Sequence, residues 1–144
     1  IAQHYMSLVY LGNSLRDILH NLFINHKLII PQWDMTLGLG ADVITTMNYY
    51  VLGDPLNLLA VFVSPEKTEY LYTFLIVLRI YLAGLVFSVY CRHWNFRPFY
   101  ILLGSYIYCF GNFALYTGIM HPFFLNPMIY LPLLLLPLPF RRVC

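Results

Sequence analysis

The chain divides near Thr68 into two halves with different patterns of polar and apolar residues. All six acidic residues fall within the first 69 positions: Asp17, Asp34, Asp42, Asp54, Glu66 and Glu69. After Glu69 there is no Asp or Glu, and long apolar runs take over. This pattern predicts a polar segment over residues 1–68 and a membrane region over residues 69–144.

Three apolar runs in the second half, 70–90, 99–117 and 123–140, are each predicted to be a transmembrane helix. A helix needs about 20 apolar residues to cross about 30 Å of hydrocarbon. The first run contains a single charge, Arg79, and the second contains none. The third contains four prolines, which membrane helices tolerate when neighbouring groups satisfy the freed carbonyls.

The basic residues predict how these helices are oriented. Arg92, Arg97 and the pair Arg141-Arg142 fall at the same side of the predicted membrane region, whereas the turn 118–122 carries no Lys or Arg. Cytoplasmic loops are enriched in Lys and Arg. The loop that follows the first span is therefore expected in the cytoplasm, and residues 1–68 are expected outside the cell.

The first half shows helical rather than spanning patterns. Apolar residues recur at helical spacing from Leu8 to Leu22, which predicts an amphipathic helix lying in the membrane interface. The glycines in 37–40 predict a turn. Asp42 is expected to cap a short helix over 42–52, and Asp54-Pro55 to begin another that ends at Val63.

Composition excludes an ordinary soluble domain. Hydrophobic residues make up 60% of the chain and charged residues 10%, whereas soluble domains have roughly 45–50% and about 25%. The net charge of +2 comes without a Lys/Arg cluster, so nucleic acid is not an expected partner. The chain begins at Ile1 and ends beside an apolar run, and we expect it to be a fragment of a longer protein.

Several polar residues are candidates for chemistry. Asp34 has no evident capping role and is the better candidate for a base or a metal ligand. Asp42 and Asp54 are expected to cap helices first, with catalysis as the alternative. The histidines lack the spacing of a zinc site. His121 would face the same compartment as Asp34, either as a simple interfacial residue or as a substrate contact.

Arg79 and the pair Tyr49-Tyr50 are candidates for binding. A charge in the middle of a span is costly, so it normally faces the bundle interior or a water-filled cavity. Arg79 would there bind an anionic headgroup or phosphate, or pair with a carboxylate from another part of the protein. The two tyrosines are predicted outside the membrane, where their rings could stack on a sugar.

An ordered set of short motifs resembles the YfhO family of bacterial membrane proteins over nearly the whole chain. The motifs are Gln3-His4-Tyr5, Leu15-Arg16-Asp17, Trp33, Gly38-Leu39-Gly40, Tyr49-Tyr50, Asp54-Pro55-Leu56-Asn57-Leu58-Leu59, Arg79 with Leu82-Ala83-Gly84, and Tyr130-Leu131-Pro132-Leu133-Leu134. Members of that family commonly have Lys where this chain has Arg79, so the charge is kept. Many have Gln where His4 stands.

The resemblance implies an all-α integral membrane protein similar to the GT-C glycosyltransferases, in which an extracytoplasmic loop with horizontal helices precedes further transmembrane helices. Such enzymes transfer sugar from a polyprenyl-phosphate carrier to cell-envelope polymers such as lipoteichoic acid. The resemblance places the main catalytic Asp a few residues before Gln3, which makes Gln3 a candidate substrate contact. Asp34 or Asp42 would assist that Asp or hold a divalent cation.

Two other functions fit the same residues. A transporter or flippase would suit Arg79 within a span and the proline-rich third span. A non-catalytic assembly protein would hold partners of cell-envelope synthesis through its external helices. In all three cases the protein is expected in the bacterial cytoplasmic membrane as a multi-pass protein.

Overall fold

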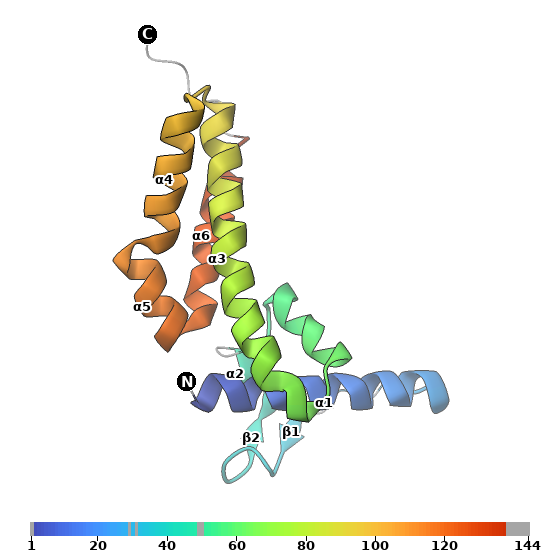
Figure 1. Ribbon diagram of the computed structural model, residues 1–144. Coiled ribbons are helices and arrows are strands. Elements are labelled where there is room, and N and C mark those ends of the chain that lie inside the picture. Colours follow the sequence, from blue (N-terminus) through green and yellow to red (C-terminus); the bar gives the residue numbers. More distant parts are fainter. Residues whose placement is uncertain (1, 29, 31, 49–50, 138–144) are drawn as a thin grey trace. The chain divides into compact units, whose positions relative to one another are not determined.

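A computed structural model describes residues 2–28, 30, 32–48 and 51–137. The chain is mostly helical (Figure 1) and forms two compact units, Ile1–Leu75 and Ile76–Cys144, so the boundary falls within one long helix. The mostly helical structure agrees with the predicted all-α class. The predicted boundary at residue 68 follows the change in composition, whereas the structural boundary follows the packing.

Unit 1 is built around helix α1 (Ala2–Ile24) and the short 3-10 helix η1 (Pro55–Phe62) that packs on it. Gly12 makes this packing possible, because a Cβ there would lie 3.0 Å from the carbonyl oxygen of Ala60. Arg16 donates hydrogen bonds to the carbonyls of Ala60 (3.2 Å) and Val63 (2.5 Å). It thereby satisfies acceptors at the C-terminal end of η1.

A small hairpin and a short helix complete the middle of unit 1. Strands β1 (Trp33–Asp34) and β2 (Ala41–Asp42) pair antiparallel, and helix α2 (Val43–Asn48) follows directly. Gly38 and Gly40 have positive φ angles of 62° and 100° in the connecting turn, which glycine adopts without a steric penalty. The turn predicted over 37–40 is therefore confirmed.

Both predicted helix caps in this region are confirmed. Asp42 Oδ1 accepts from the amide of Thr45 at 2.6 Å, at the start of α2. Asp54 Oδ1 accepts from the amide of Leu56 at 3.0 Å, and Pro55 is the first residue of η1. The helix predicted to reach residue 52 is shorter, because residues 51–53 form a turn in which the amide of Leu52 bonds to the carbonyl of Met47, five residues back rather than four.

The long helix α3 (Thr68–His93) begins in unit 1, after the one-turn helix η2 (Pro65–Lys67), and continues into unit 2. Unit 2 adds α4 (Pro98–Phe110), α5 (Asn112–Met120), η3 (Pro122–Leu125) and α6 (Asn126–Leu135). Its core comprises Ala83, Val86, Ala114, Leu125, Met128 and Ile129. Small residues from α3 and α5 thus meet larger ones from η3 and α6.

In the part of the chain that the structure describes, two helical stretches are long and apolar enough to cross a membrane, Pro65–His93 and Pro98–Met120. The predicted spans 70–90 and 99–117 lie within them. The second stretch is kinked where α4 gives way to α5 (Figure 1), because Gly111 is extended, with φ −62° and ψ 155°. The third predicted span, 123–140, reaches beyond the described residues; η3 and α6 form a shorter apolar helix over Pro122–Leu135.

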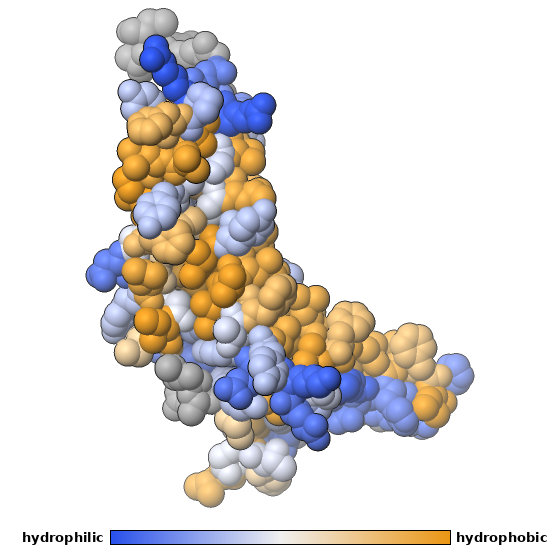
Figure 2. Space-filling view, in the orientation of Figure 1, coloured by the Kyte–Doolittle hydropathy of each residue, from blue (hydrophilic) through white to orange (hydrophobic). Residues whose placement is uncertain are grey.

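The surface of unit 2 is largely apolar, as expected of helices that contact lipid. Figure 2 shows hydrophobic residues covering much of the visible face of its helices. Large apolar side chains such as Val77, Leu85, Leu102 and Ile107 are more than 40% exposed. Soluble monomers rarely expose apolar patches of this extent, so lipid is the natural environment of these helices.

Candidate functional site

The carboxylate of Asp34 is held by three hydrogen-bond donors in unit 1. The hydroxyl of Tyr10, on α1, donates to Oδ2 at 2.7 Å. Thr36 donates to Oδ1 twice, from its amide at 2.8 Å and from its hydroxyl at 2.7 Å. The contacts from Thr36 form a local Asx turn, whereas the contact from Tyr10 joins the hairpin to the first helix.

These donors stabilise the charged form of Asp34. The hydrogen bond from Tyr10 is the largest cause that holds the pKa of Asp34 below its ordinary value, followed by the amide and hydroxyl of Thr36. The pKa of Tyr10 is raised, first by burial and then by its hydrogen bond to Asp34. Asp34 is therefore an anion, and Tyr10 a neutral donor, throughout the physiological pH range.

Asp42 lies close in the hairpin but does not join Asp34 in one site. Asp34 pairs with Ala41 across the ladder, and Trp33 pairs with Asp42. Paired residues share a face of a sheet and successive residues alternate, so the two carboxylates point to opposite faces. The amide of Thr45 is the main cause that lowers the pKa of Asp42. A catalytic role for Asp42 stays a prediction beside its confirmed role as a cap.

Metal coordination by a cluster of side chains is not evident in the described part of the chain. No group of three or more His, Cys, Asp or Glu residues lies close enough together there to hold a metal ion. Binding of a divalent cation by Asp34 or Asp42 stays a prediction. Carboxylate and phosphate oxygens are the ligands that such hard cations prefer.

Arg79 is buried in unit 2, where it is 3% exposed. Its Nε donates to Oδ1 of Asn126, at the start of α6, at a distance of 3.2 Å. Asn126 is itself 4% exposed. The pair connects the middle of α3 with α6 and fixes the direction of the guanidinium group. Sequence reasoning singled out Arg79 but not Asn126, whose position before Pro127 resembles an ordinary helix start.

His121 lies at the end of α5 and is exposed. Its amide donates to the carbonyl of Thr117 at 2.8 Å, and its ring meets the ring of Phe124 edge-on at 5.8 Å. The turn predicted over 118–122 is therefore shorter, since α5 continues to Met120. A role of His121 in substrate binding stays a prediction.

The side-chain positions of three further predicted site residues are not described by the structure. Tyr49 and Tyr50 lie outside the described residues, as does the side chain of Gln3. Conversely, the structure adds Tyr10 and Thr36 to the surroundings of Asp34. Thr36 had a signal in the sequence, since Asp followed two residues later by Thr is a common Asx-turn pattern. Tyr10 had none.

Comparison of the sequence with known protein families identifies one that matches. The family model described as bacterial membrane protein YfhO matches residues 13–139, which is most of the chain. No curated protein matches significantly, and neither does any solved structure. The matched range contains both apolar stretches, Pro65–His93 and Pro98–Met120. The chain therefore belongs to the YfhO family of bacterial membrane proteins.

Proposed function

We propose that the protein transfers a sugar from a polyprenyl-phosphate donor to a glycopolymer of the cell envelope, such as lipoteichoic acid, at the outer face of the membrane. Membership of the YfhO family and the resemblance of that family to GT-C glycosyltransferases support a membrane transferase. The observation that carries the proposal for this chain is the carboxylate of Asp34, held ionised by Tyr10 and Thr36.

The lowered pKa decides which role Asp34 takes. A general base works best when its pKa lies near the working pH, and Asp34 lies on the acidic side of its ordinary range. An ionised carboxylate with lone pairs to spare instead accepts hydrogen bonds from sugar hydroxyls or binds a divalent cation. We therefore assign Asp34 to positioning the acceptor or a cation, and proton removal to the Asp that the resemblance places before Gln3.

The departing lipid phosphate needs positive charge, and Arg79 is our candidate in unit 2. Ionisable residues within membrane helices are costly and can mark substrate or ion pathways. The hydrogen bond to Asn126 holds Arg79 in one orientation, as a preorganised phosphate contact requires. Gln3, Tyr49, Tyr50 and His121 complete the proposed substrate contacts.

The test is transfer of radiolabelled sugar from a synthetic polyprenyl-phosphate donor by the full-length protein in proteoliposomes. We expect Asp34→Asn to lower the rate at least tenfold, because the amide keeps the shape of the side chain but removes the charge. Asp17→Asn is the matched control, since Asp17 is exposed on α1 and should leave the rate unchanged. Wild-type transfer by Asp34→Asn would refute the assignment of Asp34, and no transfer by the wild type would refute the function.

A flippase is the second candidate, because the helices of unit 2 are interrupted. The second apolar stretch breaks at Gly111, and Pro132 lies inside α6. Broken helices line the pathways of many transporters. Movement of a fluorescent polyprenyl-phosphate sugar between leaflets without any transfer to acceptor would favour this function over the first.

A further inference from the structure

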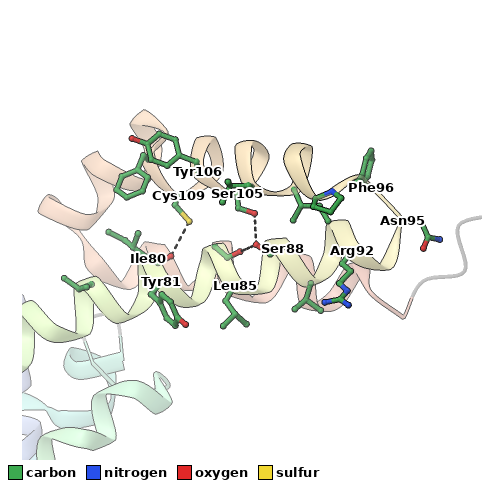
Figure 3. A pocket seen from close by; sticks show the side chains of 17 residues that line it. Ile80, Tyr81, Leu85, Ser88, Arg92, Asn95, Phe96, Ser105, Tyr106 and Cys109 are labelled. Atoms are coloured by element: carbon green, nitrogen blue, oxygen red, sulfur yellow. Dashed lines mark hydrogen bonds between the residues drawn. The ribbon is translucent and has the colours of Figure 1, made fainter.

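An elongated groove runs along α3 and α4 on the surface of unit 2. It has a volume of about 1130 Å³ and is lined on α3 by residues between Val77 and Arg92 and on α4 by residues between Pro98 and Phe110. The side chains are mostly apolar, with Leu85, Val89 and Leu102 among them. Figure 3 shows the groove from close by. All of its lining belongs to unit 2.

The polar groups along the middle of the groove bond to one another. Ser88 Oγ lies 2.8 Å from the carbonyl oxygen of Gly84 and 2.8 Å from Ser105 Oγ (Figure 3). Cys109 Sγ donates to the carbonyl of Ile80 at 3.4 Å. An occupant of the middle of the groove thus needs no hydrogen-bonding groups of its own, which suits a hydrocarbon chain.

One end of the groove has a different character. Arg92, Asn95 and Phe96 line it there, at the turn between α3 and α4. No Asp or Glu follows Glu69 in the sequence, so unit 2 offers Arg92 no carboxylate side chain. A positive charge at the membrane surface beside an apolar groove matches an anionic lipid. The headgroup would meet the charge, and the acyl chains would fill the groove.

The dimensions agree with lipid chains. From Val77 to Arg92 α3 rises about 22 Å, at 1.5 Å per residue. This exceeds the hydrocarbon depth of one leaflet, about 15 Å, so the groove is long enough for a whole acyl chain. Dividing the volume by the length of the groove gives a mean cross-section of about 50 Å². A helix with its side chains is about 10 Å across, or about 80 Å², so slender chains fill the groove better than a further helix.

We propose that this groove binds an anionic glycerophospholipid from the leaflet that borders the α3–α4 turn, with its phosphate on Arg92 and its acyl chains along α3 and α4. The proposal does not depend on sugar transfer, since it concerns a bound membrane lipid and not the substrate. Basic pockets between transmembrane helices recognise anionic lipids in this way.

The experiment is native mass spectrometry of the full-length protein in detergent, titrated with phosphatidylglycerol or with phosphatidylcholine of the same acyl chains. We expect tighter binding of phosphatidylglycerol, and Arg92→Gln to weaken it about fivefold. The effect on phosphatidylcholine should be smaller, because its choline group offsets the charge of the phosphate. Arg97→Gln is the matched control, because Arg97 is exposed in the same turn but does not line the groove. Equal effects of the two substitutions, or equal binding of the two lipids, would overturn the proposal.

Two further variants separate a lipid from a protein occupant. Leu85→Trp should fill part of the groove and lower the binding of both lipids. A photoreactive phenylalanine analogue in place of Tyr106 should cross-link to phospholipid in membranes. Cross-linking to another segment of the protein or to a second copy would show that the groove is a helix-packing surface and would refute lipid binding there. Unchanged lipid binding by Leu85→Trp would show that the lipid binds elsewhere and would refute the proposal too.

Discussion

Tyr10 and Asp34 lie 24 positions apart in the sequence, yet the tyrosine hydroxyl donates to the carboxylate at 2.7 Å. This hydrogen bond ties the hairpin of unit 1 to α1. It also holds the pKa of Asp34 down, so that the packing of one helix controls the charge of the leading candidate site residue.

The first prediction concerns the pH dependence of stability. A carboxylate whose pKa is lower in the folded than in the unfolded state stabilises the fold above the unfolded value, about 3.9. That stabilisation is lost as the pH falls through the lower folded value. Tyr10→Phe raises the folded pKa of Asp34, so the variant should lose less stability than the wild type on acidification from about pH 5 to below pH 4.

Thermal unfolding of the detergent-purified protein at a series of pH values measures this difference. Asp42 titrates in the same window, but it contributes equally to both proteins and cancels in the comparison. Tyr70→Phe, at an exposed tyrosine of the same unit, should follow the wild type. Parallel acid profiles for Tyr10→Phe and the wild type would show that the hydrogen bond does not control Asp34.

How much the sequence could predict depended on the range of each interaction. The caps at Asp42 and Asp54 were predicted correctly because a cap involves residues two or three positions apart. The two apolar helices were predictable because bilayer thickness sets their length. The strands β1 and β2 were not, since two residues each are too few to show alternation.

Long-range polar contacts were beyond the sequence. Arg79 and Asn126 lie 47 positions apart, and only the packing of α3 with α6 brings them together. The apolar run across Gly111 likewise gave no sign of a break, because glycine is common within membrane helices. Arg79 was predicted to face the bundle interior or a water-filled cavity, and it is buried beside Asn126 of α6. An anionic partner for Arg79 stays a prediction.

The second prediction tests this pair. Asn126→Leu removes the acceptor for Arg79 and should lower the stability of the full-length protein by about 1–2 kcal/mol, the upper range for polar contacts within membranes. Asn112→Leu is the matched control, because Asn112 is exposed at the start of α5. Unfolding in mixed micelles, followed by tryptophan fluorescence, compares them. Equal stabilities of the two variants would mean that the hydrogen bond contributes nothing.

The third prediction concerns the contact between α1 and η1. Replacing a helical glycine by alanine ordinarily stabilises a helix by up to about 1 kcal/mol. At Gly12 the new Cβ would lie 3.0 Å from the backbone oxygen of Ala60, so Gly12→Ala should instead destabilise unit 1 by about 1–3 kcal/mol. At Gly104 the Cβ would meet only the tip of the Phe87 ring at 3.4 Å, and Gly104→Ala should be neutral or stabilising. The melting temperatures of the two variants should therefore shift in opposite directions.

The fourth prediction is a compensating pair between α3 and α4. A Cβ at Gly84 would lie 2.6 Å from Cys109 Sγ, so Gly84→Ala should destabilise the helix pair by about 1–3 kcal/mol. Cys109→Ala removes that sulfur and creates space. The double variant should be more stable than the sum of the two single effects allows, by at least about 0.5 kcal/mol. Additive effects in a double-mutant cycle would show that the two helices do not meet at this point.

The fifth prediction concerns the side of the membrane on which Asp34 acts. The proposed function needs the hairpin to be outside the cell, and the arginines of the α3–α4 turn favour that turn inside. In a variant with its native cysteines replaced, a cysteine in place of Leu39, which is fully exposed at the hairpin, should react with a membrane-impermeant maleimide in intact cells. A cysteine in place of Asn95 should react only after the cells are opened. The reverse pattern would put Asp34 in the cytoplasm, away from any acceptor on the outer surface, and the transferase proposal would then fail whatever the fate of the lipid groove.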